Sequence, residues 1–190
     1  MNSSRRRYFI ALLPPSVVQD YANAVKQVFA TEYDSRAALR SPPHITLQAP
    51  FEWNLEEQPQ LSQALAEFAQ GQVPVPIQLK GFGAFPPRVI YLHIERTPIL
   101  LASQKALADE LERRFEICDP RKARPFRPHM TVGFRDLKRE NFRRAWAKFE
   151  AQSVEFEFTV PNLTLLLHDG KRWNAVEDFP LLGRSLDSES

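Results

Sequence analysis

Cysteine is almost absent from this chain. Cys118 is the single cysteine among 190 residues, so no disulfide can form within the chain. Long apolar runs are also absent, and no stretch approaches the roughly 20 residues that a helix needs to cross a bilayer. The apolar run Tyr8–Leu13 is too short for a signal peptide, and Pro14-Pro15 follows it without a small-residue cleavage pattern. We therefore expect a cytoplasmic protein that does not associate with membranes.

Several motifs of well-known catalytic and metal sites are missing as well. The chain has no Gly-Xaa-Ser-Xaa-Gly turn, which argues against a Ser-His-Asp hydrolase. It has neither a His-Glu-Xaa-Xaa-His motif nor paired cysteines, so the usual zinc-binding spacings are lacking. We expect neither a metal ion nor another cofactor.

A repeated tetrapeptide, Pro-His-Xaa-Thr, is the most informative feature that is present. It occurs at Pro43–Thr46 and again at Pro128–Thr131. On a β-strand, residues i and i+2 point to one face, so each copy presents an imidazole beside a hydroxyl. Histidine titrates nearest to neutral pH, and two imidazoles that meet can divide acid and base work. The repeat therefore predicts that His44 and His129 form a catalytic pair.

A phosphodiester held between the two copies fits this chemistry. One imidazole can take a proton from an attacking water while the other gives a proton to the departing oxygen. Thr46 and Thr131 can donate hydrogen bonds to the non-bridging phosphate oxygens. A nearly symmetric pair does not reveal which histidine is the base and which is the acid.

Positive charge is concentrated around the second copy of the motif. The net charge is only +2, but residues 113–144 contain eleven lysines and arginines against four acidic residues. A phosphorylated or polyanionic substrate would be attracted there. A solvated surface of ordinary ion pairs is the alternative reading.

Apolar periodicity predicts an alternation of strands and helices. The predicted helices are Ser16–Glu32, Gln60–Gln70, Pro98–Phe115 and Lys138–Glu150. The predicted strands are Tyr8–Leu13, His44–Leu47 limited by Pro50, Val75–Lys80, Val89–Glu95, His129–Phe134, Val154–Val160, Leu163–Leu167 and a short Trp173–Val176. Gly81–Pro87 is expected to be a turn-rich connection between two strands.

The order strand, helix, His-Thr strand, helix, strand occurs twice, and the two histidines are offset by 85 positions. We expect an α+β, bilobal, pseudo-duplicated fold in which two antiparallel-type sheets face a central cleft and the helices cover the outer faces. Residues 1–190 would form a single bilobal domain, with 184–190 as a disordered tail.

The paired motifs His44–Leu47 and His129–Val132 resemble those of the two-histidine (2H) phosphoesterase superfamily. The chain looks most like the bacterial group of 2'-5' RNA ligases or RNA 2',3'-cyclic phosphodiesterases, and the likeness also covers Tyr8–Leu12, Gly81–Pro86 and Leu163–Leu167. The resemblance implies a bilobal fold with both motifs in a central cleft. It also implies metal-independent opening of 2',3'-cyclic phosphates to 2'-phosphates, or reversible joining of RNA ends.

Two departures from the family pattern indicate a divergent branch. Phe134 stands where the best-known branch often has an arginine, and Arg135 follows one residue later. Gln48–Phe51 replaces the usual ending after the first motif. Arg127 and Arg124 are therefore candidates for the missing phosphate contact, with Arg135 as a further one, because guanidinium matches phosphate geometry; surface charges are the alternative.

Aromatic residues near the motifs could stack on a nucleobase, although burial in the core is their commoner role. Phe85, on the glycine-rich segment, is the best stacking candidate. The other two histidines, His93 and His168, are given no catalytic role, since one alternates with apolar neighbours and the other ends a strand.

The paired motifs predict a phosphodiesterase, and the resemblance implies that it acts on RNA or a nucleotide carrying a 2',3'-cyclic phosphate. An RNA-end-binding module without turnover, and a 2'-5' RNA end-joining activity, are the alternatives. No obligate protein partner is indicated, and a monomer is expected.

Overall fold

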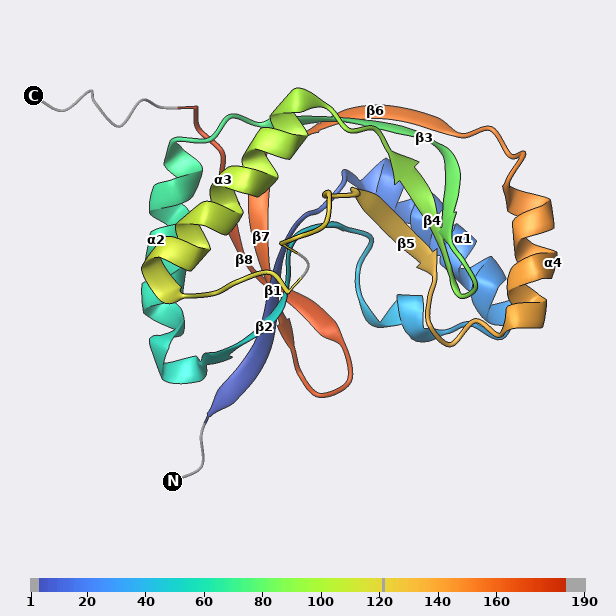
Figure 1. The fold of residues 1–190 in the computed structure, drawn as a ribbon, viewed down its shortest axis with the longest axis horizontal. Helices are drawn as coiled ribbons and strands as arrows, with labels where there is room; N and C mark the ends of the chain where they lie inside the picture. The colour runs from blue at the N-terminus through green and yellow to red at the C-terminus, as the bar shows by residue number, and fades with distance from the viewer. Residues whose placement is uncertain (1–3, 121, 184–190) are drawn as a thin grey trace, which may run out of the picture.

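The computed structural model describes residues 4–120 and 122–183, in which strands and helices alternate as in Figure 1. The helices are α1 (Ser16–Glu32), α2 (Gln58–Gln70), α3 (Pro98–Phe115) and α4 (Arg139–Phe149), with short 3-10 helices η1 (Ala37–Arg40) and η2 (Leu55–Glu57). The strands are β1 (Arg5–Leu12), β2 (Ile45–Asn54), β3 (Val75–Phe85), β4 (Val89–Ile94), β5 (His129–Gly133), β6 (Glu155–Val160), β7 (Asn162–His168) and β8 (Trp173–Pro180).

The strands form two four-stranded antiparallel sheets. Sheet A has the order β2-β1-β7-β8, and sheet B has the order β5-β4-β3-β6. The strand that follows or carries each His-Thr motif, β2 or β5, lies at one edge of its sheet. The α+β class predicted from the sequence is therefore confirmed.

The duplication predicted from the order of elements is visible in the structure. The order β1-α1-β2-α2-β3 is repeated as β4-α3-β5-α4-β6. The two halves exchange helices: α1 packs on β5 of sheet B, and α3 packs on β2 of sheet A. Each motif-bearing strand is thus supported by a helix from the other repeat, so neither half can be positioned without its partner.

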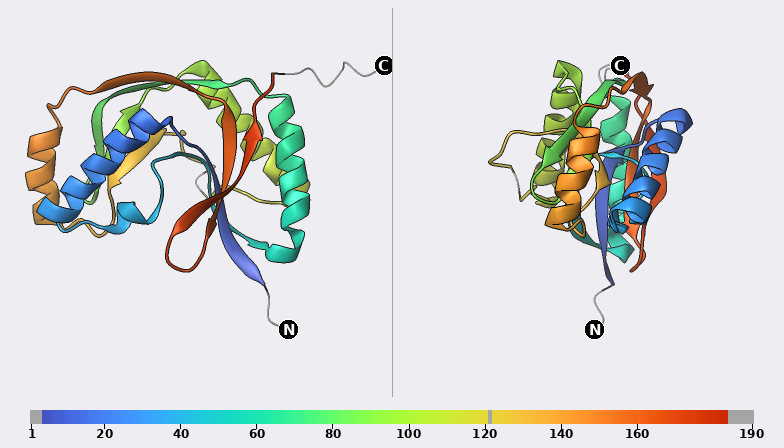
Figure 2. Two further views of the ribbon diagram at one scale, coloured as in Figure 1. Left: turned by 180° about the vertical axis from the view of Figure 1, so that it is seen from behind. Right: turned by 90° about the vertical axis from the view of Figure 1, so that its right-hand side faces the viewer.

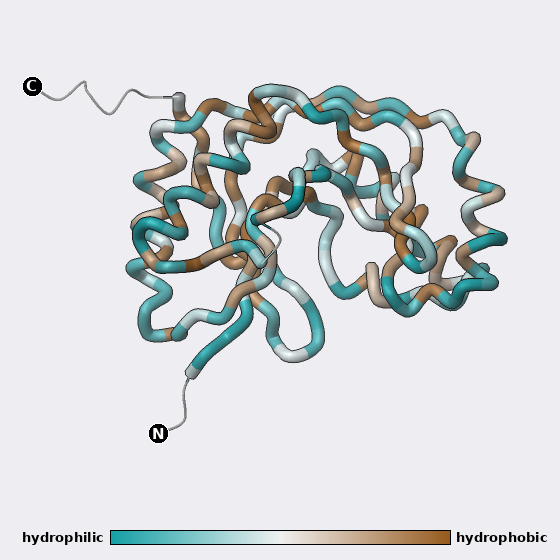
Figure 3. The backbone as a smooth tube through the Cα atoms, viewed as in Figure 1, coloured by the Kyte–Doolittle hydropathy of each residue, from teal (hydrophilic) through white to brown (hydrophobic). Residues whose placement is uncertain are grey.

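The molecule has the shape of an arch. Figure 2 shows α2 and α3 at one end and α1 and α4 at the other, with the strands between them. In Figure 3 the brown, apolar stretches recur along the central strands, whereas the start of β1 and the β7–β8 hairpin are teal. The helices lie on the outer sides of the two sheets, as the sequence predicted.

Strand β1 is apolar on both faces because it is covered on both. Tyr8, Ile10 and Leu12 belong to the main core, which is continuous through both lobes. Phe9 and Ala11 point the other way and pack with Leu166 in a small second cluster. A short run that is apolar throughout is the expected sequence of a strand buried on both sides.

Several predicted boundaries were wrong. The strand predicted as a short Trp173–Val176 continues to Pro180 as β8, because it pairs with β7 along its whole length. Two other boundaries also have a physical reason. Strand β2 does not stop at Pro50 but continues to Asn54, because it is an edge strand on which an exposed proline costs no ladder hydrogen bond. Gly81–Pro87 is not a loop throughout: β3 extends through it to Phe85, with a register shift between Leu79 and Phe82 and Gly81 at a φ of +68°. These glycines mark a bulge rather than a turn.

The predicted disordered tail, 184–190, lies outside the described residues. In the part of the chain that the structure does describe, no helix combines the length and the apolar character required to cross a bilayer.

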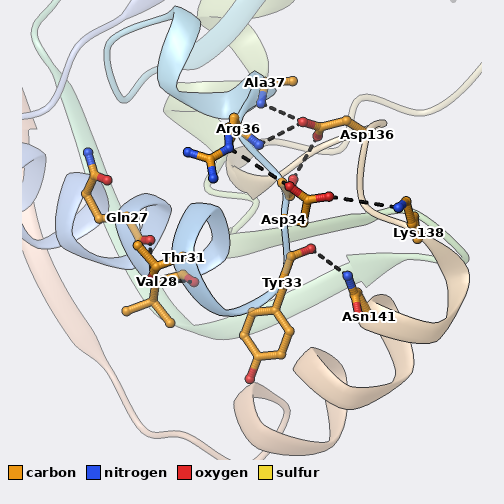
Figure 4. A network of polar contacts seen from close by, with 11 residues as sticks. Gln27, Val28, Thr31, Tyr33, Asp34, Arg36, Ala37, Asp136, Lys138 and Asn141 are labelled. Carbon is orange, nitrogen blue, oxygen red and sulfur yellow. Dashed lines mark hydrogen bonds and ion pairs between the residues drawn. The ribbon is translucent and has the colours of Figure 1, made fainter.

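A carboxylate joins the loops that adjoin the two motifs (Figure 4). Asp136, shortly after β5, accepts hydrogen bonds from the Ser35 hydroxyl at 2.8 Å and from the backbone N–H groups of Arg36 and Ala37 at 2.7 and 2.8 Å. The Ser35 hydroxyl in turn accepts a bond from the Phe134 N–H at 3.3 Å. The residue that precedes helix η1 makes no side-chain capping bond, and Asp136, about 100 residues later in the chain, accepts the N–H bonds that such a cap would accept. We call this group the Asp136 clasp.

We predict that Asp136→Ala lowers the free energy of unfolding by about 1–3 kcal/mol, because it leaves three donors of the α1–η1 loop without their charged acceptor. Urea melts checked by circular dichroism give the value. Asp20→Ala, at an exposed position of α1, is the matched control and should change stability by less than about 0.5 kcal/mol. Equal losses in the two variants would contradict the structural role of the clasp.

Candidate active site

The two motif histidines are held in the same way. His44 directly precedes β2, and its Nδ1 lies 2.7 Å from the carbonyl oxygen of Pro42. His129 begins β5, and its Nδ1 lies 2.7 Å from the carbonyl oxygen of Arg127. A carbonyl oxygen can only accept, so each Nδ1 carries the hydrogen and donates it. The Nε2 atom of each imidazole is therefore the one that can exchange protons with a substrate.

Register places each threonine on a defined face of its sheet. Thr46 lies opposite Ala11, which belongs to the second cluster, and Thr131 lies opposite Tyr91. Directly paired residues of an antiparallel ladder share a face. Neither threonine hydroxyl forms a hydrogen bond with another residue of the described chain, so both hydroxyls are available to a ligand.

The structure brings the two motifs together. Strands β2 and β5, each at the edge of its own sheet, contact one another. The charge of His129 is one of the causes that lower the pKa of His44, which requires the two imidazoles to lie within electrostatic range. Residues 85 positions apart in the chain thus share one region.

Burial has a strong effect on the pKa of His44. Burial lowers its pKa from 6.5 to about 4; the hydrogen bond to Pro42 opposes this shift, and the positive charges of Lys26 and His129 add to it. Lys26 itself is buried on α1, and its Nζ donates to the Ser41 carbonyl at 2.9 Å. Burial lowers the pKa of Lys26 to about 8. His44 is consequently neutral throughout the physiological pH range.

Two aromatic rings pack against His129. The Phe85 ring meets the imidazole edge-on at 5.0 Å between centroids, and the Tyr91 ring lies 5.2 Å away. The two rings also contact each other at 4.6 Å. Phe85, the candidate for base stacking, therefore lies beside a motif histidine. Tyr91 was not among the site residues predicted from the sequence. It lies two residues from His93 on a strand of alternating polarity, so both side chains are on the same face of the sheet, and this pattern could have identified it.

Gly83 makes room for Tyr91. The two residues lie opposite each other on β3 and β4, and a Cβ at position 83 would approach the Tyr91 ring to 2.4–2.7 Å. No other residue fits there unless the ring moves, and the ring is in contact with His129.

A row of rings lies on the other side of the site. Phe9 contacts His44 at 4.7 Å, Trp173 contacts Phe9 at 4.7 Å, and His168 contacts Trp173 at 4.8 Å. Arg7 lies over the Trp173 ring at 5.6 Å. Phe9 could not be singled out from the sequence, because it lies within a run that is apolar throughout. The residues of this row also come from distant parts of the chain.

The candidate arginines differ in their surroundings. Arg127 and Arg124 are exposed, and the charge of Arg127 partly offsets the rise that burial causes in the pKa of Tyr91. Arg135 lies over the ring of its neighbour Phe134 at 5.4 Å. Arg127 is thus the candidate closest to the residues around His129.

Other cations of the basic segment are already paired with acids. Arg113 pairs with Glu110 at 2.8 Å, and Arg114 pairs with Glu67 at 2.7 Å. Lys122 pairs with Glu112 as well. For these residues the alternative reading, an ordinary ion-paired surface, describes the structure.

His93 lies opposite His129 and 3.9 Å from Glu95, and it is partly exposed. Within residues 4–120 and 122–183, no group of three or more His, Cys, Asp or Glu side chains is arranged to hold a metal ion.

A duplicated α+β fold with a His-Xaa-Thr motif beside the edge strand of each sheet defines the class of two-histidine phosphoesterases. The chain matches the model of the 2'-5' RNA ligase superfamily over residues 13–172, and it belongs to that family.

Relatives and solved structures agree with this membership. The chain is 34% identical over 182 residues to a Geobacillus thermodenitrificans protein named "Putative phosphoesterase", covering 94% of this chain and 98% of the relative. It resembles the structure of Escherichia coli LigT in its apo form, with a TM-score of 0.69 and 19% identity, over 94% of this chain and 99% of the other. The crystal structure of TT0787 from Thermus thermophilus gives a TM-score of 0.67 with 21% identity, over 94% and 100% of the two chains.

We predict that Gly83→Ala destabilises the protein by about 1–3 kcal/mol, because the new methyl group must displace Tyr91. The imidazole NMR signals of His129 should shift at the same time. In a Tyr91→Ala background the same change should cost much less, since the obstructing ring is gone, and a double-mutant cycle measures the difference. Additive effects would show that the contact between residues 83 and 91 is unimportant.

We predict that His44 stays neutral from pH 8 down to about pH 5 in an NMR titration, because its pKa in the folded protein is about 4. The unfolded chain, with an ordinary histidine pKa of about 6.5, binds the proton more readily. Stability from this group is therefore fully present above the unfolded value and is lost as the pH falls from about 6.5 towards 4. Lys26→Met should raise the pKa of His44, and a His44 midpoint near 6.5 in the wild type would contradict the assignment.

Proposed function

We propose that the protein is a metal-independent phosphodiesterase that hydrolyses 2',3'-cyclic phosphates, at RNA ends or on small nucleotides, to 2'-phosphates. The observation that carries this proposal is the matched pair of imidazoles, each with its Nδ1–H bound to a carbonyl two residues earlier and its Nε2 left for proton transfer. Such a pair supplies a base and an acid without a metal ion.

The different surroundings of the two histidines suggest their roles. His44 is kept neutral, so we assign it as the base that removes a proton from water through Nε2. The water oxygen bonds to phosphorus, the bond from phosphorus to the 3'-oxygen breaks, and protonated His129 delivers its Nε2 proton to that oxygen. The 2'-phosphate is the product, and the proton gained by His44 and the one lost by His129 balance.

The remaining proposed contacts stabilise the charge of the phosphate. Thr46 and Thr131 donate hydrogen bonds to its non-bridging oxygens. Arg127 supplies positive charge on the His129 side, with Arg124 and Arg135 as weaker candidates. Phe85, partly exposed beside His129, is proposed to contact the base of the nucleotide.

The comparisons support a nucleotide substrate. Crystal structures of Escherichia coli LigT have been solved with 3'-AMP and with NADP+ bound, so that protein holds nucleotides in a similar fold. The family description also names RNA ligation, and joining RNA ends through a 2'-5' linkage remains the alternative chemistry, with RNA-end binding without turnover as the other. Cytoplasmic location, a monomeric state and a single bilobal domain over 1–190 also remain predictions.

We predict that His44→Ala and His129→Ala each reduce hydrolysis of a 2',3'-cyclic-phosphate oligonucleotide by about 10²–10⁴-fold. The double variant should be hardly slower than either single one, because the two groups act as a unit. EDTA should have no effect, and identification of the product end by chromatography should give a 2'-phosphate. Hydrolysis that survives in the double variant would refute the assignment, and loss of activity in EDTA would refute metal independence.

The threonines provide matched variants for the same assay. Thr131→Val keeps the shape of the side chain and removes its donor, whereas Thr131→Ser keeps the donor. We expect the valine variant to lose about 10-fold or more in kcat, in line with the loss of one oxyanion contact, and the serine variant to lose far less. Equal losses in the two variants would indicate a packing role for Thr131.

A further inference from the structure

An open hollow lies between the β7–β8 hairpin and the segment that contains η1. It has a volume of about 500 Å³ and is lined by Arg36, Leu39, Arg40, His168, Gly170, Lys171 and Arg172. In Figure 1 the hairpin and η1 both lie on the lower side of the molecule. We call this site the basic pocket, because its lining contains four cationic side chains and no acidic one.

Most of these positive charges are not neutralised by neighbours. Arg36 lies 4.0 Å from Asp34 in an exposed ion pair. Arg40, Lys171 and Arg172 make no side-chain ion pair with any acidic residue of the described chain. The pocket therefore differs from α3, where Arg113 and its neighbours are paired with glutamates. Unpaired cations that converge on a hollow favour an anion there.

The one acid of the hairpin turn is engaged elsewhere. Asp169 accepts hydrogen bonds from the backbone N–H groups of Lys171 and Arg172, both at 2.7 Å, and from the Asn174 amide at 2.9 Å. These bonds, led by the one from Arg172, lower the pKa of Asp169 to about 2. Its carboxylate shapes the turn that presents the two cations, and it does not line the pocket.

His168 adds a neutral donor to the pocket. Its Nδ1 accepts a hydrogen bond from the Gly170 N–H at 3.2 Å, so the imidazole proton resides on Nε2. This tautomer is the reverse of that in His44 and His129, where Nδ1 donates. His168 is thus arranged to donate to a ligand rather than to take a proton from one.

The basic pocket is connected to the histidine site by short contacts. His168, Trp173 and Phe9 form a row of rings that ends at His44, with successive centroids 4.8, 4.7 and 4.7 Å apart. Arg40 lies only four residues before His44 in the chain. Since a nucleic acid strand rises about 3.4 Å per nucleotide in a duplex, one ligand that spans a few nucleotides can reach both sites.

We propose that the basic pocket binds a second phosphate group of the substrate whose cyclic phosphate lies between His44 and His129; the second part of this statement rests on the proposed function. Guanidinium groups and a histidine N–H match phosphate oxygens, and the pocket offers donors without competing carboxylates. The second phosphate could belong to an internal linkage of an RNA strand or to the 5'-phosphate chain of a small nucleotide. Both sources share this chemistry, and they are separated by experiment.

Phosphate binding is tested directly by NMR titration of the full-length protein with inorganic pyrophosphate. The amide signals of His168, Gly170 and Lys171 should shift saturably in the wild type, and their response should weaken by about tenfold or more in Arg40→Ala/Arg172→Ala. Lys105→Ala/Arg113→Ala, which removes two ion-paired cations from α3, is the charge-matched control and should respond like the wild type. Absence of shifts in the hairpin, or shifts unchanged in the Arg40→Ala/Arg172→Ala variant, would overturn the proposal.

Kinetics then identify the source of the second phosphate. The wild type is given 2',3'-cyclic substrates of one to six nucleotides, together with a cyclic mononucleotide that carries a 5'-triphosphate. If the second phosphate belongs to an RNA strand, kcat/KM should rise with the number of nucleotides in the substrate. If it belongs to a small nucleotide, the 5'-triphosphate alone should give the full increase in kcat/KM. In either case Arg40→Ala/Arg172→Ala should abolish the increase in kcat/KM by raising KM. Hydrolysis of the cyclic mononucleotide without a 5'-phosphate should be unaffected.

The outcomes distinguish this inference from the proposed function. If the wild type hydrolyses none of these compounds, the proposed function fails, while the pyrophosphate titration still decides whether the pocket is a phosphate site. If all compounds are hydrolysed equally well, or if Arg124→Ala/Arg127→Ala removes the gain and the pocket variant does not, the pocket has no part in substrate binding.

Discussion

Everything that the site can do depends on one hydrogen bond made twice, from a histidine Nδ1 to the carbonyl two residues earlier. The bond fixes the tautomer and the direction of each ring through the local chain alone. The proline of each tetrapeptide contributes to this, because it locks its own φ and keeps the residue before it extended. Pro43 and Pro128 are both buried, so the local geometry is also held by packing. The motif is therefore a device for orienting an imidazole, and its proline is as much a part of it as its histidine.

The same hydrogen bond occurs in two different surroundings. The protonated form of His44 is disfavoured by burial and, to a smaller extent, by the charge of Lys26, a buried lysine of α1. His129 lies at the edge of sheet B against Phe85 and Tyr91. The pKa of His44 thus depends on its tertiary surroundings, first on burial and to a smaller extent on the charge of Lys26, and nothing in the tetrapeptide specifies either. The proposed division of labour, with His44 as the base and His129 as the acid, rests on this difference in surroundings.

Local signals in the sequence predicted much of the architecture. The bounds of α1 and α3 agree with the apolar periodicity that begins after Pro15 and Thr97, and the duplicated order of elements was apparent from the two motifs. The same reasoning failed where a residue acts through a distant partner. Pro50 is tolerated because β2 is an edge strand, and Gly83 is required by the ring of Tyr91. Neither fact can be seen without the pairing of the strands.

The charge distribution shows the same limit. The sequence directed attention to residues 113–144, where cations are dense, but several of them turn out to be paired with acids on α3 and nearby. The cations that line the basic pocket without an ion pair in the described chain are Arg40, Lys171 and Arg172, which come from two stretches far apart in the sequence. The number of cations in a stretch of sequence shows how much positive charge is present, but only the fold determines which cations lie together around one hollow.

The Asp136 clasp has a consequence for how the two halves of the chain can change. The backbone that it anchors carries Arg36, continues through Arg40 and delivers His44 to its place. A single carboxylate from the second repeat, that of Asp136, therefore fixes the position at which the segment leading to His44 in the first repeat begins. Lengthening or shortening either connecting loop would therefore displace the functional segments of both repeats.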